Sequence, residues 1–183
     1  MYAIELMMEE HKNIKRMLKI VRKVCFNILE GEEINYEDFE KIISFITNYA
    51  DSHHHKKEEI YLFNKMVEEI GERAVKVINH GMLVEHDLGR LYISNLKLSL
   101  EEYKNGNKES KLDIIANSIS YTDLLNRHIE KEDNVIYNFA KRSLKQDTFE
   151  IINKECKDFE DSYKNIEKEN ICILNTLEEK YCK

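Results

Sequence analysis

The most constraining feature of this sequence is a repeated spacing, His-x-x-x-Glu. The two pairs that carry it are 74 residues apart and are His54/Glu58 and His128/Glu132. Residues four apart on an α-helix lie one turn apart on the same face, so each pair can direct an imidazole and a carboxylate at one point. A lone histidine, His11 or His86, precedes each pair on a different predicted helix. Four imidazoles capping two ions and two carboxylates bridging them would suit a pair of iron ions, so the sequence predicts a helical bundle around a two-metal centre.

Little in the sequence interrupts helices. Proline is absent and glycine occurs five times in 183 residues, and these two residues disfavour helices most. The chain is long enough to bury a substantial core as one domain. We therefore predict an all-α fold, with residues 1–183 as a single domain.

Turn and capping signals divide the chain into helices. The expected ranges are about 3–30, 35–70, 72–103, 110–143 and, for a C-terminal helical region, 144–183. Asn35 is expected to cap the second helix and Gly71 to end it, and Asn105-Gly106-Asn107 to form a turn. Short connections imply antiparallel neighbours, so residues 1–143 should form an up-down-up-down four-helix bundle. The C-terminal region is expected to pack on that bundle.

Two further signals concern the ends and the continuity of helices. Ser110 with Asp113, and Asp147 with Glu150, have the spacing of a capping box at a helix N-terminus. The last helical region is expected to break or bend near residues 167–170.

The two halves of the sequence resemble copies of one helical hairpin. HHKKEEIYLFN (54–64) aligns with HIEKEDNVIYN (128–138), and Glu10-His11 aligns with Glu85-His86. A metal centre on the pseudo-two-fold axis between the copies would take one lone histidine and one His/Glu pair from each.

The repeat also decides between three consecutive histidines. Adjacent helical residues point about 100° apart, so only one of His53, His54 and His55 can face the centre squarely. His55 with Glu59 is the rival register, but the 74-residue offset aligns His54 with His128. We therefore predict His54 as the ligand, and His53 and His55 as flanking or surface residues. His80 lies about 240° around its helix from His86 and is not expected to be a ligand.

Charge and hydropathy limit the partners. The net charge of −7 disfavours nucleic acid and anionic membranes, which bind basic surfaces. No apolar stretch has the length of a membrane-spanning helix, and the first ten residues lack the pattern of a signal peptide. We expect a soluble cytoplasmic protein. The four cysteines are widely spaced and are expected to be free thiols: Cys25, Cys156, Cys172 and Cys182.

The donor types favour iron, with manganese or zinc as competitors. Ferritin-like di-iron bundles use Glu-x-x-His, and none of the four predicted histidines has a glutamate three residues earlier. This argues against an iron-storage or radical-generating relative of ferritin.

The order His, His-x-x-x-Glu, His, His-x-x-x-Glu resembles the hemerythrin-like (HHE cation-binding) domain. The segments HHKKEEIYLF, GMLVEHDLGRLY and HIEKEDNVIY are similar to bacterial and archaeal members, and the resemblance covers about residues 3–143. It implies a non-haem di-iron centre completed by a solvent-derived oxo or hydroxo bridge. In that centre the terminal ligands would be His11, His54, His86 and His128, and the bridging carboxylates Glu58 and Glu132.

The resemblance implies a function at that centre. Members bind dioxygen or nitric oxide, or react with peroxide, so we expect a small diatomic ligand bound for sensing, scavenging or storage. The alternative is a redox enzyme of oxidative or nitrosative stress that reduces nitric oxide, oxygen or peroxide, or repairs iron–sulfur clusters, with an electron donor that the sequence does not identify. Oxygen-carrying relatives have a further histidine where this sequence has Met82. Two histidines per iron would leave an exchangeable position on both metals, which favours reactive or sensing chemistry over oxygen transport.

Other residues near the predicted ligands have two readings each. Gly89 either leaves room for a small ligand or allows close helix packing. Tyr121 either donates a hydrogen bond to a bound oxygen species or is a core tyrosine. Glu59 and Asp133 either accept hydrogen bonds from ligand N–H groups or are solvated.

Overall fold

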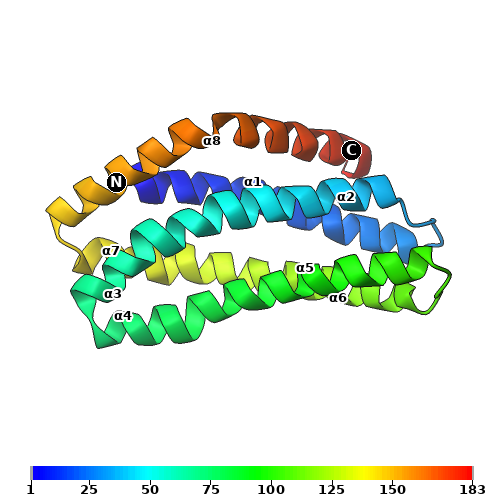
Figure 1. Cartoon of the computed structure of the whole chain (residues 1–183), viewed down its shortest axis with the longest axis horizontal. Coiled ribbons are helices and arrows are strands. Elements are labelled where there is room, and N and C mark those ends of the chain that lie inside the picture. Colours follow the sequence, from blue (N-terminus) through cyan, green and yellow to red (C-terminus); the bar gives the residue numbers. More distant parts are fainter. Residues whose placement is uncertain (1, 183) are drawn as a thin grey trace.

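The computed structural model describes residues 2–182 and shows four long helical rods with a fifth helix lying across one side (Figure 1). Segments labelled η are π-helical, with backbone bonds from residue i+5 to residue i. In chain order the elements are α1 (Tyr2–Leu29), α2 (Tyr36–Phe45), η1 (Ile46–His55), η2 (Glu58–Phe63), α3 (Asn64–Ile70), α4 (Glu72–Val77), η3 (Ile78–Met82), α5 (Leu83–Lys104), α6 (Ser110–Lys131), η4 (Glu132–Ile136), α7 (Tyr137–Ser143) and α8 (Gln146–Tyr181).

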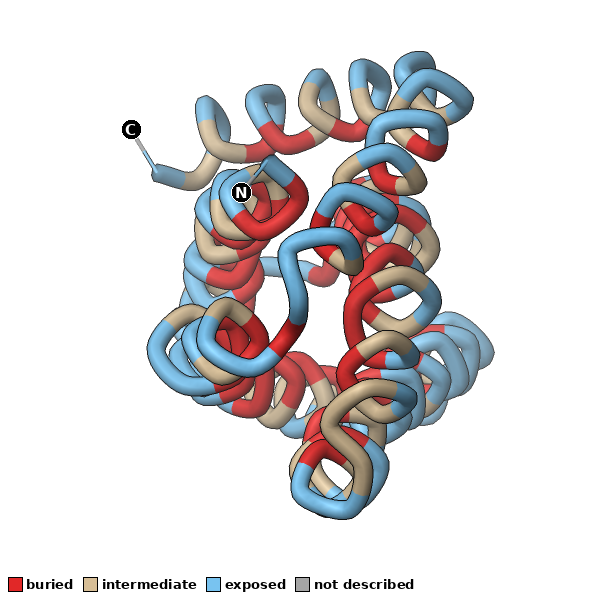
Figure 2. Tube along the Cα trace, turned by 90° about the vertical axis from the view of Figure 1, so that its left-hand side faces the viewer, coloured by how far each residue is buried: buried red, intermediate tan, exposed pale blue. Residues whose placement is uncertain are grey.

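Each rod runs antiparallel to the one before it, which confirms the predicted all-α bundle with an additional C-terminal helix (Figure 1). The first rod is α1, the second runs from α2 to α3, the third from α4 to α5, and the fourth from α6 to α7. Viewed along the rods, buried positions line the inner sides of all four (Figure 2). None of the described helices combines the length and hydrophobicity that crossing a membrane requires.

The turns between rods follow the sequence signals in most places. The Asn35 side chain accepts a 3.1 Å hydrogen bond from the Asp38 N–H and caps α2, as predicted. Gly71 ends α3 with a φ of 72°, a left-handed conformation that glycine adopts without steric cost. The turn after α5 includes Gly106 at a φ of 100°.

Both predicted capping boxes are wrong. The residue before α6 is Glu109, which makes no capping bond through its side chain, and Ser110 lies inside the helix. The Ser110 hydroxyl instead donates a 2.7 Å hydrogen bond to Glu102 across the turn. At the start of α8, Lys145 occupies the cap position and Asp147 already lies in the first turn.

The C-terminal region is one unbroken helix, α8, so the predicted break is wrong, while the bend is visible as an arch over the bundle (Figure 1). Polar side chains along α8 bond back to its own carbonyls. Ser162 bonds to Phe159 O, and Asn170 to Ile166 O. Such bonds commonly accompany helix bending. The helix packs against α1, α2, η1 and η2, all in the first two rods.

The hydrophobic core is divided into two clusters. On α1, Met7 belongs to one and Ile14 to the other, and the buried polar residues Glu10 and His11 lie between them. The other three rods show the same interruption. A polar layer thus crosses the middle of the bundle, at the level where the predicted ligands lie.

Candidate metal centre

The structure brings all six predicted ligands together in the polar layer. All six are buried, and they lie on different rods: His11 on α1, His54 and Glu58 on η1 and η2, His86 on α5, and His128 and Glu132 on α6 and η4. Two groups of donors have one atom from every member within 4.8 Å of the others. They are His11, His54, Glu58 and Glu132, and His55, Glu58, His86 and His128.

Wide helical turns occur beside the ligands in two of the four rods, the second and the fourth. The Lys56 N–H bonds to Asp51 O, the Asn64 N–H to Glu59 O, and the Tyr137 N–H to Glu132 O, each five residues back. A turn that holds more residues places adjacent side chains at a smaller angle than an α-helix does. Two neighbouring histidines in η1 can therefore face the centre together.

Each carboxylate of the centre lies between the two groups. The Oε2 atom of Glu132 is 3.3 Å from His11 Nε2, and its Oε1 atom is 3.0 Å from His128 Nε2. The Oε2 atom of Glu58 is 3.5 Å from His54 Nε2 and 3.6 Å from His86 Nε2. Each glutamate therefore has carboxylate oxygens close to histidines of both groups.

A carboxylate orients each of the four predicted histidines. The Nδ1–carboxylate distances are 2.7 Å for His11 to Asp133, 2.8 Å for His54 to Glu10, 2.7 Å for His86 to Glu59, and 2.9 Å for His128 to Glu85. An Nδ1–H that donates to a carboxylate fixes the ring and leaves Nε2 as the metal-binding atom. Of the two readings left open for Glu59 and Asp133, these contacts favour the one in which both accept a hydrogen bond from a histidine. Glu10 and Glu85 were missed, although the repeat places both directly before the lone histidines.

The donors fit cations because several are otherwise unpaired. Four buried atoms of the centre make no hydrogen bond: His54 Nε2, Glu58 Oε2 and both carboxylate oxygens of Glu132. Each such buried polar atom costs about 1–3 kcal/mol. Cations between these atoms would satisfy them all at once.

Without a metal, the two carboxylates have opposite protonation tendencies. Burial and the nearby charge of Glu132 raise the pKa of Glu58 well above its usual value. Burial alone would raise the pKa of Glu132 as well, but His128, His11 and His86 hold it well below its usual value. One carboxylate therefore tends to keep a proton while the other is ionised, as expected for two acids that share a site.

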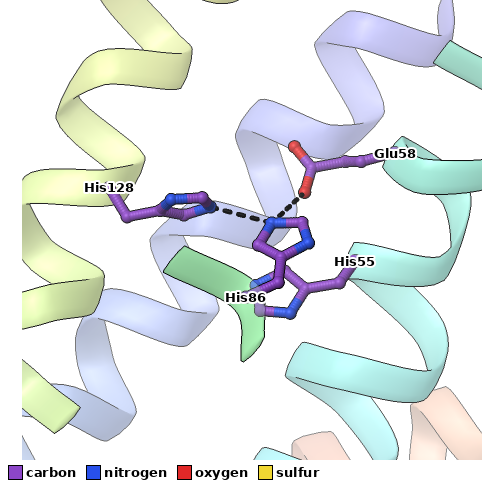
Figure 3. A group of neighbouring side chains, drawn as sticks. All are labelled: His55, Glu58, His86 and His128. Atoms are coloured by element: carbon purple, nitrogen blue, oxygen red, sulfur yellow. Dashed lines mark hydrogen bonds and ion pairs between the residues drawn. The ribbon is translucent and has the colours of Figure 1, made fainter. Parts of the chain in front are cut away.

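His53 and His55 were predicted to be flanking or surface residues. Neither lies at the surface, because both are buried. The His55 ring stacks on His86 with ring centroids 3.8 Å apart, and it belongs to the second group of donors (Figure 3). His53 faces α8, with Nε2 2.9 Å from Glu160 Oε1. His80, which was not expected to be a ligand, is exposed.

His53, Glu10 and Glu160 form a third group of donors close enough to hold a cation. The Lys57 ammonium already lies among them and donates to both glutamates. This buried lysine supplies the positive charge that the carboxylates need, so the group is a salt-bridge network.

Tyr137 is a site residue that the sequence reasoning missed. Its hydroxyl donates a 2.5 Å hydrogen bond to Glu58 Oε1 and lies 3.5 Å from His11 Nε2. A signal existed in the repeat, because Tyr137 aligns with Phe63 and differs from it by this hydroxyl.

A pocket of about 220 Å³ opens beside the second group of donors, with His55, His86, Gly89 and Tyr121 in its lining. A Cβ atom added to Gly89 would lie 3.5 Å from Leu125 and 3.6 Å from Tyr121, both ordinary van der Waals distances. Tight packing therefore does not require this glycine. Its position on the pocket wall agrees with the reading that it leaves room for a small molecule.

Comparison with known proteins assigns the chain to a family. A family model described as the hemerythrin HHE cation binding domain matches residues 2–140. A Plasmodium falciparum (isolate 3D7) protein named "Putative autophagy-related protein 11" is 29% identical over 170 residues, which are 87% of this chain and 11% of that protein. The chain thus spans about a tenth of that relative's length. No solved structure matches.

Proposed function

The chain belongs to the hemerythrin HHE cation-binding family, and on this premise we propose that it is a non-haem di-iron protein. It binds a small diatomic ligand, dioxygen or nitric oxide, for sensing, scavenging or storage. One observation carries the proposal: four buried histidines are each fixed through Nδ1 by a carboxylate, and their Nε2 atoms surround two carboxylates with unpaired oxygens.

The proposed ligands divide between two positions. The first position is defined by His11 and His54, and the second by His86 and His128, with Glu58 and Glu132 shared between them. Bound iron would supply an exchangeable position and a reversible change of oxidation state, with a solvent-derived oxo or hydroxo bridge; zinc fits similar donors but has no redox chemistry. The protein holds the imidazoles in one orientation and buries all six side chains away from bulk water.

Turnover is the second candidate function, as a di-iron enzyme that reduces nitric oxide, oxygen or peroxide under oxidative or nitrosative stress. Such reductions consume protons, and the Tyr137 hydroxyl supplies a proton-bearing group in contact with Glu58. Burial and the nearby charge of Glu132 raise the pKa of Tyr137, so the hydroxyl keeps its proton at neutral pH.

Metal analysis and optical spectroscopy of freshly purified protein test the proposal. We expect two irons per chain with charge-transfer bands of an oxo-bridged pair. Anaerobic reduction followed by dioxygen, nitric oxide or peroxide then separates the two functions, because a stable adduct indicates binding and catalytic consumption indicates an enzyme. Colourless protein loaded with zinc and inert to oxidants would contradict both.

Ligand variants test the site itself. His54→Ala and Glu132→Ala should each lose iron, because each removes a donor from the centre. His80→Ala is the matched control, since this histidine is exposed, and it should keep two irons. Two irons retained by both ligand variants would refute the proposed ligand set.

A further inference from the structure

We propose that His55 is a fifth imidazole ligand, so that the two metal positions are inequivalent. The second position takes three imidazoles, from His55, His86 and His128, and the first takes two. This inference rests on the metal pair of the proposed function and adds to it a ligand that only one half of the repeat supplies.

The position of His55 is that of a ligand. The side chain is 4% exposed and has a donor atom within 4.8 Å of donor atoms of Glu58, His86 and His128. Its ring stacks on His86 and lies edge-on to His128 with centroids 5.8 Å apart. Figure 3 shows the three imidazoles and Glu58 gathered at one place, from three different rods.

Like the other four histidines, His55 has a carboxylate beside Nδ1. Asp51 Oδ1 lies 3.4 Å from that atom, one helical turn back. Arg90 holds this carboxylate with a 3.0 Å bond from Nε, and it donates a 2.7 Å bond to Glu59, the carboxylate that orients His86. One guanidinium thus fixes the acceptors of both stacked histidines.

The carboxylate of Asp51 beside Nδ1 leaves the second ring nitrogen of His55 as the atom that can bind a cation.

The repeat shows that the third imidazole belongs to one half only. The residue aligned with His55 in the second half is Ile129, which lies in the hydrophobic core. With both carboxylates shared, the second position has five protein donors and the first has four. His55 and His86 also line the pocket beside the second position. The second position would then take three histidines, in place of the two per iron that Met82 led us to expect.

The test compares wild type with His55→Gln, which removes the imidazole and keeps a polar side chain. After loading with iron, wild type should show two resolved iron environments of equal amount by Mössbauer spectroscopy. In His55→Gln the spectrum should change, and one of the two irons should be lost at least 100-fold faster to a chelator. His80→Gln should match wild type in both measurements.

Asp51→Asn provides a second variant that keeps the imidazole and tests the same geometry if His55→Gln does not fold. Loss of a carboxylate that orients a metal-bound histidine lowers metal affinity about 10- to 100-fold, so one iron should dissociate faster by that factor. A wild-type protein that binds two irons in one environment, or variants that retain both irons as wild type does, would overturn the assignment of His55 alone. A wild type that binds no iron pair would instead refute the proposed function.

Discussion

The two hairpins of the molecule, residues 2–70 and residues 72–143, orient their histidines in the same way but differ in what covers them. Within each hairpin, the residue before the lone histidine fixes the other histidine: Glu10 bonds to His54, and Glu85 to His128. Between hairpins the bonds cross, from His86 to Glu59 and from His11 to Asp133. The site has the pseudo-two-fold arrangement that the sequence repeat predicts.

A second layer of charges repeats as well. Lys57 donates to Glu10, and its counterpart Lys131 donates to Glu85. Exposure separates the two lysines, since Lys57 is 0% exposed and Lys131 is 48% exposed. The cause is α8, which packs on the first hairpin and adds Glu160 as a second acceptor for Lys57. In the first hairpin, α8 therefore buries an ion pair that is exposed in the second hairpin and extends it into a network.

Replacing Lys57 should lower the free energy of unfolding most, because this lysine marks the main difference between the two hairpins. Lys57→Met leaves Glu10 and Glu160 without their cation in a buried place, and removing one partner of a buried ion pair costs about 3–5 kcal/mol. Urea unfolding of the metal-free protein measures the loss. A loss below about 1 kcal/mol would mean that the network is not buried in solution.

The second difference is the hydroxyl of Tyr137, which Phe63 lacks. Tyr137→Phe removes the donor to Glu58 and should cost the metal-free protein about 1–3 kcal/mol, because a buried acceptor loses its partner. The same urea experiment gives the size of the effect. Unchanged stability would show that Glu58 finds another partner.

Acid should loosen the C-terminal end of α8 from α2 in the first hairpin. Asp38 on α2 accepts bonds from Lys180 and Tyr181, and although burial raises its pKa, these two donors lower it below the usual value. A lowered folded-state pKa gives a stabilisation that is present above the unfolded-state pKa and is lost as pH falls through the folded-state value. Hydrogen-exchange protection factors at the α8 C-terminus, corrected for the intrinsic pH dependence of exchange, should therefore fall at acidic pH. Asp38→Asn should lose most of this pH dependence, and an equal dependence in both proteins would contradict the assignment to Asp38.

The smallest effect is expected for Lys131→Met, the counterpart of the Lys57 variant. An exposed ion pair contributes about 0.2–1 kcal/mol, so stability should hardly change. Equal losses in the two lysine variants would show that α8 does not create the difference between the hairpins.

The sequence predicted the rods, their antiparallel order and the residues that meet in the polar layer. These depend on local signals: the absence of proline, glycine at the turns, and the repeat. The inward position of His55 was missed because η1 is π-helical, and a reading based on α-helical angles allows only one of three adjacent histidines to face inward. The hydroxyl of Ser110 found an acceptor in another helix, Glu102, which a capping pattern does not reveal.

The polar layer between Met7 and Ile14 has a consequence for how the chain holds together. The two apolar clusters are separate, and several buried polar atoms between them have no hydrogen-bond partner, among them His54 Nε2 and both carboxylate oxygens of Glu132. Cations bound there would join the two ends, since whatever binds only the native form stabilises it. The cellular supply of metal would then set the rigidity of the whole molecule as well as the chemistry at its middle.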